Sequence, residues 1–356
     1  MLVEPLNDAQ EWESFVAGSP QGTFYHTLKW KNVLEEFFGF ETHYLTIRHP
    51  SGVLVGVCPL VLARKLRLFK VLDSLPDSDF AGPLIRDEYA EVATHALSIY
   101  LRQLATKNSV VYARIRCNSE SLSDNLRMGN SKVETPVGTM NLSLTDMTPD
   151  FLWDNVFTKK GGQRKFIKRC EEAGLQNKEI ESKQDLQAFY DLYSNNLRHI
   201  GAAPFAFRLF EYLYDSLYPD NFNVIITSDN KRCFAAQGLF LYPERNAIYL
   251  TFLGIDREME KRLHSTQYLH WGTIQWAQTR GFQFIGFGST PSDPQSTQYL
   301  SKSKFGTTFN QDYVVYMRFN KSVFFIRERA VQLGRKLKKS LPKKLQGVLS
   351  KMGQDL

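Results

Sequence analysis

Two lysines that could hold phosphate groups lie in the C-terminal part of the chain. Lys302 and Lys304 follow a predicted strand, Phe284–Phe287, in a stretch rich in Ser and Lys. Lysine ammonium groups act as point charges toward phosphate oxygens, and such contacts weaken as salt is added. The pattern therefore indicates a phosphate-binding loop. The alternative is a pair of lysines that are simply solvated.

Other residue types that could do chemistry form weaker patterns. Arg164 and Lys165 begin a basic face on a predicted helix, which could contact RNA or lie in water. His199 and His264 have no partner at a spacing that would make either a general base, so none is assigned. The four cysteines form no CxxC pair, which predicts neither a zinc site nor a disulfide framework; they are Cys58, Cys117, Cys170 and Cys233.

Length and composition indicate the number of domains and the class of protein to which these residues belong. A chain of 356 residues is long enough for two domains. Its content of 43% hydrophobic and 23% charged residues is typical of a globular protein and argues against wholesale disorder. The first twelve residues do not resemble a secretory signal, and the longest apolar stretch, Val53–Ala63, is too short to span a bilayer. These features predict a cytoplasmic protein.

The basic charge is concentrated in the C-terminal tail. The net charge is +7, but residues 321–351 hold ten Lys and Arg and one acid, so the tail carries +9 and the remainder −2. Apolar residues recur every three or four positions in the tail, from Ile326 to Met352. A basic amphipathic helix of this kind suits an anionic membrane surface, where each base contributes about 1 kcal/mol. The alternatives are a helix packed on the body of the protein, or a contact with RNA.

The elements that must position these residues follow one plan twice. In the first half, a helix over Thr27–Phe38 precedes a hairpin of strands over Glu41–Arg48 and Val53–Leu62. Strand 68–75, helix 89–105 and strand 110–117 come next. In the second half, helices over 185–198 and 207–218 precede strands over 222–227, 233–241 and 247–253, and then helix 266–279 and strand 284–287.

Helices that alternate with antiparallel strands predict an α+β fold in two copies. The predicted organisation is one domain over residues 1–150, a second over 151–320 and the basic amphipathic tail over 321–356.

The stretch from Tyr249 to Gly306 carries a resemblance to a known family. The helix pattern Trp271..Ile274..Ala277...Gly281, a strand that ends in Phe287-Gly288, and the segment Lys302-Ser-Lys-Phe-Gly306 resemble the FemAB-type peptidyltransferases. In the first half, the segments 24–40, 44–60 and 74–84 are similar to the opening helix, the hairpin and the "slP..dygGpl" segment of that family. Arg164–Gly174 resembles its "R..i.+a...G" helix.

The resemblance implies a fold and a set of site residues. The family contains two domains of the GCN5-related N-acetyltransferase (GNAT) fold, so each half is expected to be a mainly antiparallel, mixed sheet flanked by helices. The expected substrate-binding residues are Trp30, Lys31, Asp79, Gln237, Tyr249 and Lys302. Lys302 and Lys304 are expected at phosphates, and Arg164 and Lys165 at phosphates or RNA.

Each of these residues also has a purely structural interpretation. Trp30 and Tyr249 could pack in a core, and Lys31 could lie on the surface. Asp79 could stabilise a turn, and Gln237 could be a hydrogen-bonded strand residue. Two positions depart from the family pattern: its aspartate before Phe287 is Gly286 here, and its phenylalanine before the key lysine is Ser301. The first departure puts any role of that aspartate in doubt.

The resemblance also bears on cofactors. Acetyltransferases of this fold hold the pyrophosphate of coenzyme A with a glycine-rich loop at a helix start. The corresponding stretch here, Arg257–Gln267, has no glycine. Acyl-CoA is therefore disfavoured, no cofactor is predicted, and the chemistry requires no metal.

The resemblance implies an enzyme that forms amide bonds. It would move an aminoacyl or other acyl group from aminoacyl-tRNA onto an amine of a cell-envelope precursor, such as a lipid-linked muropeptide or an amino sugar. The tail would place it at the inner face of the cell membrane. One alternative is an N-acyltransferase of exopolysaccharide precursors that uses another activated donor, such as acyl-CoA. Another is a non-catalytic module of the same fold that binds membrane or RNA.

Overall fold

The computed structural model forms two compact units. Unit 1 comprises the described residues of Met1–Thr139 and Asn310–Leu356, and unit 2 comprises those of Met140–Phe309. The structure describes residues 1–65, 69–76, 78–127, 131–158, 162–229, 232–320, 322, 324, 325 and 329.

The division differs from the predicted boundary near residue 150 because the chain returns to unit 1 after unit 2. Strand β15 (Tyr313–Arg318), which the prediction assigned to the second domain, pairs antiparallel with β6 (Val110–Cys117). Its other neighbour is β7 (Lys132–Glu134), which also belongs to unit 1. Unit 2 is thus inserted between two strands of the first sheet.

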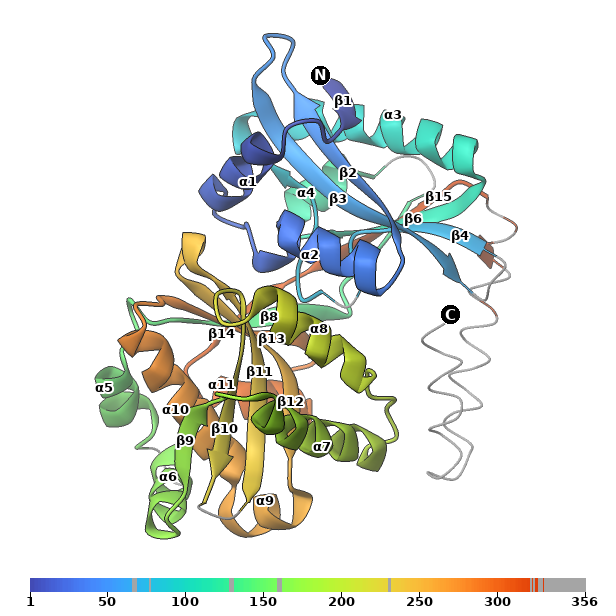
Figure 1. Ribbon diagram of the computed structural model, residues 1–356. Coiled ribbons are helices and arrows are strands. Elements are labelled where there is room, and N and C mark those ends of the chain that lie inside the picture. Colours follow the sequence, from blue (N-terminus) through green and yellow to red (C-terminus); the bar gives the residue numbers. More distant parts are fainter. Residues whose placement is uncertain are drawn as a thin grey trace. The chain divides into compact units, whose positions relative to one another are not determined.

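Unit 1 is built on an eight-stranded sheet with the order β1-β2-β3-β4-β6-β15-β7, and β5 pairs with β3 (Figure 1). Its further strands are β1 (Leu2–Pro5), β2 (Glu41–Arg48), β3 (Leu54–Lys65), β4 (Phe69–Asp73) and β5 (Leu84–Ile85). Its helices include α1 (Ala9–Gly18), η1 (Phe24–His26), α2 (Leu28–Asn32), the π-helical turn η2 (Val33–Phe37), η3 (Asp87–Tyr89), α3 (Ala90–Asn108) and α4 (Glu120–Asn125). The core lies between α3 and the apolar face of the sheet.

Unit 2 is built on a seven-stranded sheet with the order β14-β8-β13-β12-β11-β10-β9. Its strands are β8 (Val137–Ser143), β9 (Gln176–Glu179), β10 (Phe222–Ser228), β11 (Cys233–Tyr242), β12 (Ala247–Ile255), β13 (Phe284–Pro291) and β14 (Thr308–Gln311). Its helices include α5 (Pro149–Phe151), η4 (Leu152–Val156), α6 (Gln163–Glu172), α7 (Lys183–His199), α8 (Phe207–Leu217), η5 (Pro243–Arg245), α9 (Arg257–Leu263), α10 (Ser265–Thr279) and α11 (Thr297–Ser303).

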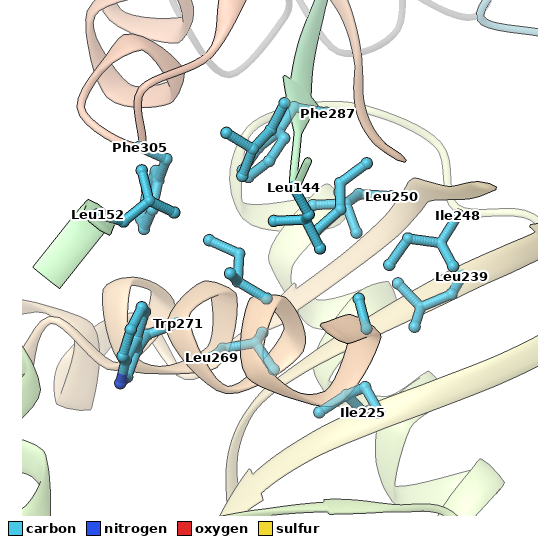
Figure 2. Close-up of a cluster of buried hydrophobic side chains, with 14 of the residues drawn as sticks. Leu144, Leu152, Ile225, Leu239, Ile248, Leu250, Leu269, Trp271, Phe287 and Phe305 are labelled. Carbon is cyan, nitrogen blue, oxygen red and sulfur yellow. The ribbon is translucent and has the colours of Figure 1, made fainter. Parts of the chain in front are cut away.

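Both faces of the second sheet are covered, because alternate residues of a strand point to opposite sides. Leu239 of β11 belongs to the cluster that packs against α10, and Figure 2 shows it with Leu269 and Trp271 of that helix. Its neighbour Phe240 points the other way and contacts Phe252, whose ring packs against aromatic rings of α7 and α8. The sheet therefore forms the middle layer of a helix–sheet–helix arrangement.

Each sheet contains a parallel pair of strands. In unit 1 the pair is β4 and β6, which ends at Asp73 opposite Arg114. In unit 2 it is β12 and β13, whose pairing ends at Tyr249 opposite Gly286. Strand β12 continues for six residues beyond its last pair with β13, so the two strands separate there. The α+β fold with two mixed sheets confirms the predicted fold class.

The predicted amphipathic tail lies almost entirely outside the described residues. Of residues 321–356, the structure describes Ser322, Phe324, Phe325 and Arg329. Phe324 is buried in unit 1 against the rings of Tyr112 and Tyr316. The interpretation of the rest as a membrane anchor remains a prediction.

Candidate functional site

In unit 2, Lys302 is fixed at the end of β13. Its ammonium donates hydrogen bonds to the carbonyl oxygens of Gly288 (3.2 Å) and Ser289 (2.9 Å) and to Thr290 Oγ1 (3.0 Å). An ammonium has three N–H donors, so these three acceptors match its full capacity. Lys302 thus joins α11 to the segment of β13 that lies beyond the last pair with β12.

The segment around Lys302 is a short helix, not the loop that the sequence pattern predicts. Ser296 caps the start of α11 by accepting a hydrogen bond from the Tyr299 N–H (3.2 Å). Phe305, just after the helix, is 1% exposed and stacks on Phe287 of β13 at 5.7 Å. Figure 2 shows Phe305 inserted into the unit 2 core. This buried ring keeps α11 against the strand, and so keeps Lys302 in place.

The glycine that replaces the family's aspartate has a structural explanation. Gly286 lies opposite Tyr249 in the parallel pair, and a Cβ atom at Gly286 would come within 2.8 Å of Tyr249 Cδ1. The Tyr249 ring therefore covers Gly286. Tyr249 itself is 5% exposed and also contacts Phe284, so its ring packs on the sheet near the point where the strands separate.

Gln237 is buried on β11, and its amide nitrogen donates two hydrogen bonds. Its Nε2 donates to the carbonyl oxygens of Gly238 (3.0 Å) and Phe252 (3.1 Å). It is 3% exposed, which matches the structural interpretation of this residue. A substrate contact at Gln237 remains a prediction.

The start of α10 is occupied by a carboxylate of the protein. Glu260 Oε2 accepts hydrogen bonds from the Thr266 N–H (2.8 Å), from Thr266 Oγ1 (2.9 Å) and from Ser265 Oγ (3.0 Å). Helix N-termini attract anions because their first N–H groups are unpaired and the helix dipole is positive there. A phosphate group at this place would have to displace the Glu260 carboxylate.

His270 of α10 was not singled out by its sequence context, but its environment is unusual. Its ring contacts Phe287 (5.5 Å) and Phe305 (5.2 Å), and its Nδ1 is buried with no hydrogen-bond partner. Burial and, to a smaller extent, the nearby positive charge of Lys302 together lower the pKa of His270 to about 4. His270 is therefore neutral at physiological pH.

The other basic residues of unit 2 that were predicted at phosphates or RNA are Arg164, Lys165 and Lys304. Arg164 donates to the carbonyl oxygen of Trp153 (2.6 Å) and to Asp154 (2.9 Å), so its charge is engaged locally. Lys165 and Lys304 are exposed. Their predicted phosphate or RNA contacts remain predictions.

In unit 1, residues 74–76 and 78–83 belong to a loop that is fixed by buried polar groups. Trp30 is 3% exposed, and its Nε1 donates to Ser78 Oγ at 3.0 Å. The Tyr25 hydroxyl donates to Asp79 Oδ2 at 3.2 Å. Asp79 is partly exposed. The structure therefore brings Trp30 and Asp79 to one loop, with Trp30 supporting it from the core.

His26 completes the support of this loop. Its Nδ1 accepts a hydrogen bond from the Thr23 N–H (3.1 Å), so its Nε2 carries the proton and donates to the Gly82 carbonyl (2.9 Å). Burial lowers the pKa of His26 to about 4. Only a glycine fits at position 82, because an added Cβ would lie 1.8 Å from the Arg116 carbonyl oxygen. The loop is thereby held against β6.

Lys31 is half-buried on α2, the helix that also carries Trp30. Its ammonium pairs with Glu35 at 2.6 Å, one helical turn away, and the Thr42 hydroxyl also donates to Glu35. The lysine also lies over the Tyr44 ring, 5.9 Å from its centre. This environment is typical of a surface ion pair, and a substrate contact remains a prediction.

Sequence reasoning missed a charged cluster behind the loop. Arg116 of β6 donates through Nη1 to the carbonyl oxygens of Ser78 (3.0 Å) and Asp79. Its Nε lies 3.8 Å from the carboxylate of Asp312, which is 3% exposed. Asp312 immediately precedes β15, and no local pattern indicates that this strand joins β6.

Two kinds of feature are absent from the described part of the chain. No helix there is long and apolar enough to cross a membrane. Nor does that part contain a group of three or more His, Cys, Asp or Glu side chains that could hold a metal ion.

Comparisons with known proteins agree on the fold. A protein-family profile described as "Acetyltransferase (GNAT) domain" matches residues 160–294. Among solved structures, FemX is 14% identical; the match covers 92% of this chain and 99% of FemX, with a TM-score of 0.71. No curated protein sequence matches the chain significantly.

Two further structures extend this result. L-PGS from Bacillus licheniformis is 13% identical, with 89% of this chain and 93% of that chain covered and a TM-score of 0.56. A tandem GNAT protein from the clavulanic acid biosynthesis pathway is 12% identical, with 88% and 97% covered and a TM-score of 0.55. The protein therefore has the tandem GNAT fold.

Proposed function

We propose that the protein is a FemAB-like transferase that moves an aminoacyl or other acyl group from aminoacyl-tRNA onto an amine. The acceptor would be a cell-envelope precursor, such as a lipid-linked muropeptide or an amino sugar. The observation that carries this proposal is the position of Lys302. The lysine of the family-like segment is held at the end of β13 by three hydrogen bonds, within a fold that matches FemX over 92% of the chain.

The proposed reaction requires little more than alignment of the reactants and positive charge near the developing oxyanion. The amine nitrogen attacks the carbonyl carbon of the ester, the ester oxygen leaves, and the nitrogen loses a proton. Holding the reactants in line, with positive charge near the developing oxyanion, accelerates such a step. Lys302 supplies a fixed positive charge, and its three hydrogen bonds hold that charge in one place.

The N-terminus of α10, which is occupied by a carboxylate of the protein, supports a donor other than acyl-CoA. It already binds the Glu260 carboxylate through a backbone N–H and two hydroxyl groups. A pyrophosphate at this place would meet like charge, which is unfavourable. The same stretch lacks the glycines that a phosphate loop requires.

The test is transfer of a labelled aminoacyl group from charged tRNA to an amine acceptor, with an acyl-CoA donor assayed in parallel. We expect turnover with charged tRNA and none with acyl-CoA. Turnover with acyl-CoA alone would instead indicate an N-acyltransferase of another precursor. Binding of tRNA with no turnover by either donor would indicate a non-catalytic module.

A matched pair of variants makes this test specific. Lys302→Ala should reduce turnover, because Lys302 lies at the strand end. Lys107→Ala, at an exposed position near the end of α3 in unit 1, should leave turnover nearly unchanged. Equal activity of both variants and of the wild type at physiological salt would contradict the role of Lys302.

A further inference from the structure

Helices α6 and α9 of unit 2 pack side by side and carry a group of basic side chains. Arg169 Nη1 of α6 donates a hydrogen bond to the Arg262 carbonyl oxygen of α9 at 3.1 Å. Cys170 Sγ, the next residue of α6, donates to the Leu263 carbonyl oxygen at 3.3 Å. These two contacts place one side of α6 against the last turn of α9. Residues of both helices therefore contribute to one surface.

The bases of this surface, which we call the α6–α9 surface, are directed to solvent. Four of them are exposed and Arg169 is half-buried; the exposed ones are Lys165, Lys168, Lys261 and Arg262. Residues three and four apart lie on the same face of a helix, so the two lysines of α6 share a face with Arg169. The ion pairs in the described part of unit 2 join other side chains. Their charges are thus available to an anionic partner.

The order of charges along α6 opposes the helix dipole. Arg164 and Lys165 lie in its first turn, which contains no acid, whereas Glu171 and Glu172 lie at its end. The dipole favours acids at the start of a helix and bases at its end. Helix stability therefore does not explain the bases at the start of α6. In α9 the bases lie in the last turn, which the dipole favours, and they extend the basic surface of α6.

An aromatic pair lies among these bases. The ring of Phe166 in α6 is 4.0 Å from that of His264, the residue after α9, and both residues are half-buried. Bases of a nucleic acid stack on such rings, and lysine and arginine neighbours bind the adjoining phosphates. Among the described residues, the large apolar side chains that are exposed lie outside α6 and α9. The surface therefore lacks the apolar groups of a membrane-binding face.

The α6–α9 surface lies next to the start of α10, the helix that leads to Lys302. Helix α10 begins directly after His264, and the Tyr268 hydroxyl donates to the Leu175 carbonyl oxygen (3.0 Å), close to the end of α6. His270, whose ring contacts the rings beside Lys302, is six residues beyond His264. At 1.5 Å per residue, this separation along the helix is about 9 Å.

We propose that the α6–α9 surface binds the double-stranded stem of an RNA through its phosphate backbone, and that the Phe166–His264 pair stacks on an unpaired base beside the stem. Proteins recognise double-stranded RNA mainly by shape and backbone contacts, which a surface of lysine and arginine can make without reading the sequence. The inference rests on the proposed function for the identity of the RNA, which would be the tRNA of the donor. Its single-stranded end would then follow α10 toward Lys302.

The test measures RNA binding and not turnover. The probe is a fluorescently labelled RNA hairpin with a short unpaired 3′ end, and its affinity for the full-length protein is measured by fluorescence anisotropy at about 50 and 200 mM salt. The variant is the double substitution Lys168→Gln/Arg262→Gln. Each phosphate contact that is lost lowers the slope of log affinity against log salt by about 1. We therefore expect the slope to fall by about 2, which makes the loss of affinity about 16-fold larger at the lower salt.

A matched variant controls for the change in net charge. Arg102→Gln/Lys107→Gln removes two exposed bases from α3 of unit 1 and so lowers the net charge by the same amount. It should keep the affinity and the salt slope of the wild type. The basic C-terminal segment is present in every protein compared, so its contribution to RNA binding cancels in the differences.

A further variant tests the stacking contact. His264 has a left-handed backbone conformation with φ +57°, which asparagine adopts readily. His264→Asn therefore keeps the backbone while it removes the ring. It should weaken binding of the hairpin with the unpaired end about tenfold, the effect of one lost base–ring stack. A blunt hairpin, which has no unpaired base to stack, should bind His264→Asn and the wild type equally.

Several outcomes would overturn the inference. These are equal salt slopes for Lys168→Gln/Arg262→Gln and the wild type, an equal loss in the control variant, or loss of binding to phosphatidylglycerol vesicles while RNA binding persists. The last result would indicate a membrane-binding surface. If charged tRNA is turned over and the double variant binds the hairpin as the wild type does, the surface is wrong and the proposed function stands. If the hairpin binds as expected but no donor is turned over, the proposed function is wrong and the RNA surface stands.

Discussion

Replacing Lys302 by Met removes three hydrogen bonds while it keeps the length of the side chain. Hydrogen bonds from a charged donor contribute about 1.5–3 kcal/mol each. Lys302 is partly exposed, so water can take over part of this role. We therefore expect the free energy of unfolding to fall by about 2–3 kcal/mol, less than the sum of three bonds. The measurement is urea unfolding followed by tryptophan fluorescence, because Trp271 lies in the core of the same unit.

The variant Lys302→Arg separates the charge of Lys302 from its hydrogen bonds, and Lys304→Met is the control for stability. Lys302→Arg keeps the charge, but a planar guanidinium cannot converge on three acceptors as an ammonium does. If Lys302 acts by fixing the end of β13, Lys302→Arg should lose both stability and turnover, as Lys302→Met does. Lys304→Met should change the unfolding free energy by less than about 0.5 kcal/mol.

The opposite result would refute this reasoning. If Lys302→Arg is as stable and active as the wild type, and Lys302→Met reduces only the salt-dependent part of donor binding, the lysine acts as a simple point charge on phosphate. The three hydrogen bonds would then be incidental to function.

Two other predictions concern stability. Burial lowers the pKa of His26 to about 4, so the unfolded chain binds more protons between pH 4 and 6.5. The unfolding free energy should fall by about 3 kcal/mol as pH drops through this range, and His26→Gln should lose that part of the dependence in a pH series of urea titrations. Gly286→Asp, which introduces the aspartate of the FemAB-type pattern, places a Cβ 2.8 Å from the Tyr249 ring. The substitution should lower the free energy of unfolding by about 1–3 kcal/mol, as measured by thermal unfolding. Adding Tyr249→Ala should recover part of that loss if the clash is the cause.

Local sequence patterns predict most elements of the fold. The apolar run over Val110–Cys117 predicts a strand with the same bounds as β6. The helical pattern over residues 266–279 agrees with α10 to within one residue at its start. Both segments are regular and rich in apolar residues, so the local pattern alone indicates their type.

The parts that were not predicted depend on contacts between distant residues. Arg116 and Asp312 are separated by nearly two hundred positions, and their proximity follows from the pairing of β15 with β6. No periodicity within either segment predicts that the two strands pair. Likewise, the Ser/Lys composition around Lys302 suggests a loop, but Phe305 and the end of β13 stabilise a helix there. Asp79 could be identified from sequence because its segment resembles a family motif, whereas its charged neighbours carry no such signal.

The insertion of unit 2 between two strands of the first sheet has a consequence for synthesis on the ribosome. All residues of unit 2 emerge before β15, which pairs with β6 over six positions and with β7 over three. Unit 2 can therefore complete its sheet while unit 1, although it was translated first, still lacks the strand between β6 and β7. The order of maturation is thus the reverse of the order of translation, and the exposed edge of β6 must remain unpaired until the last part of the chain appears.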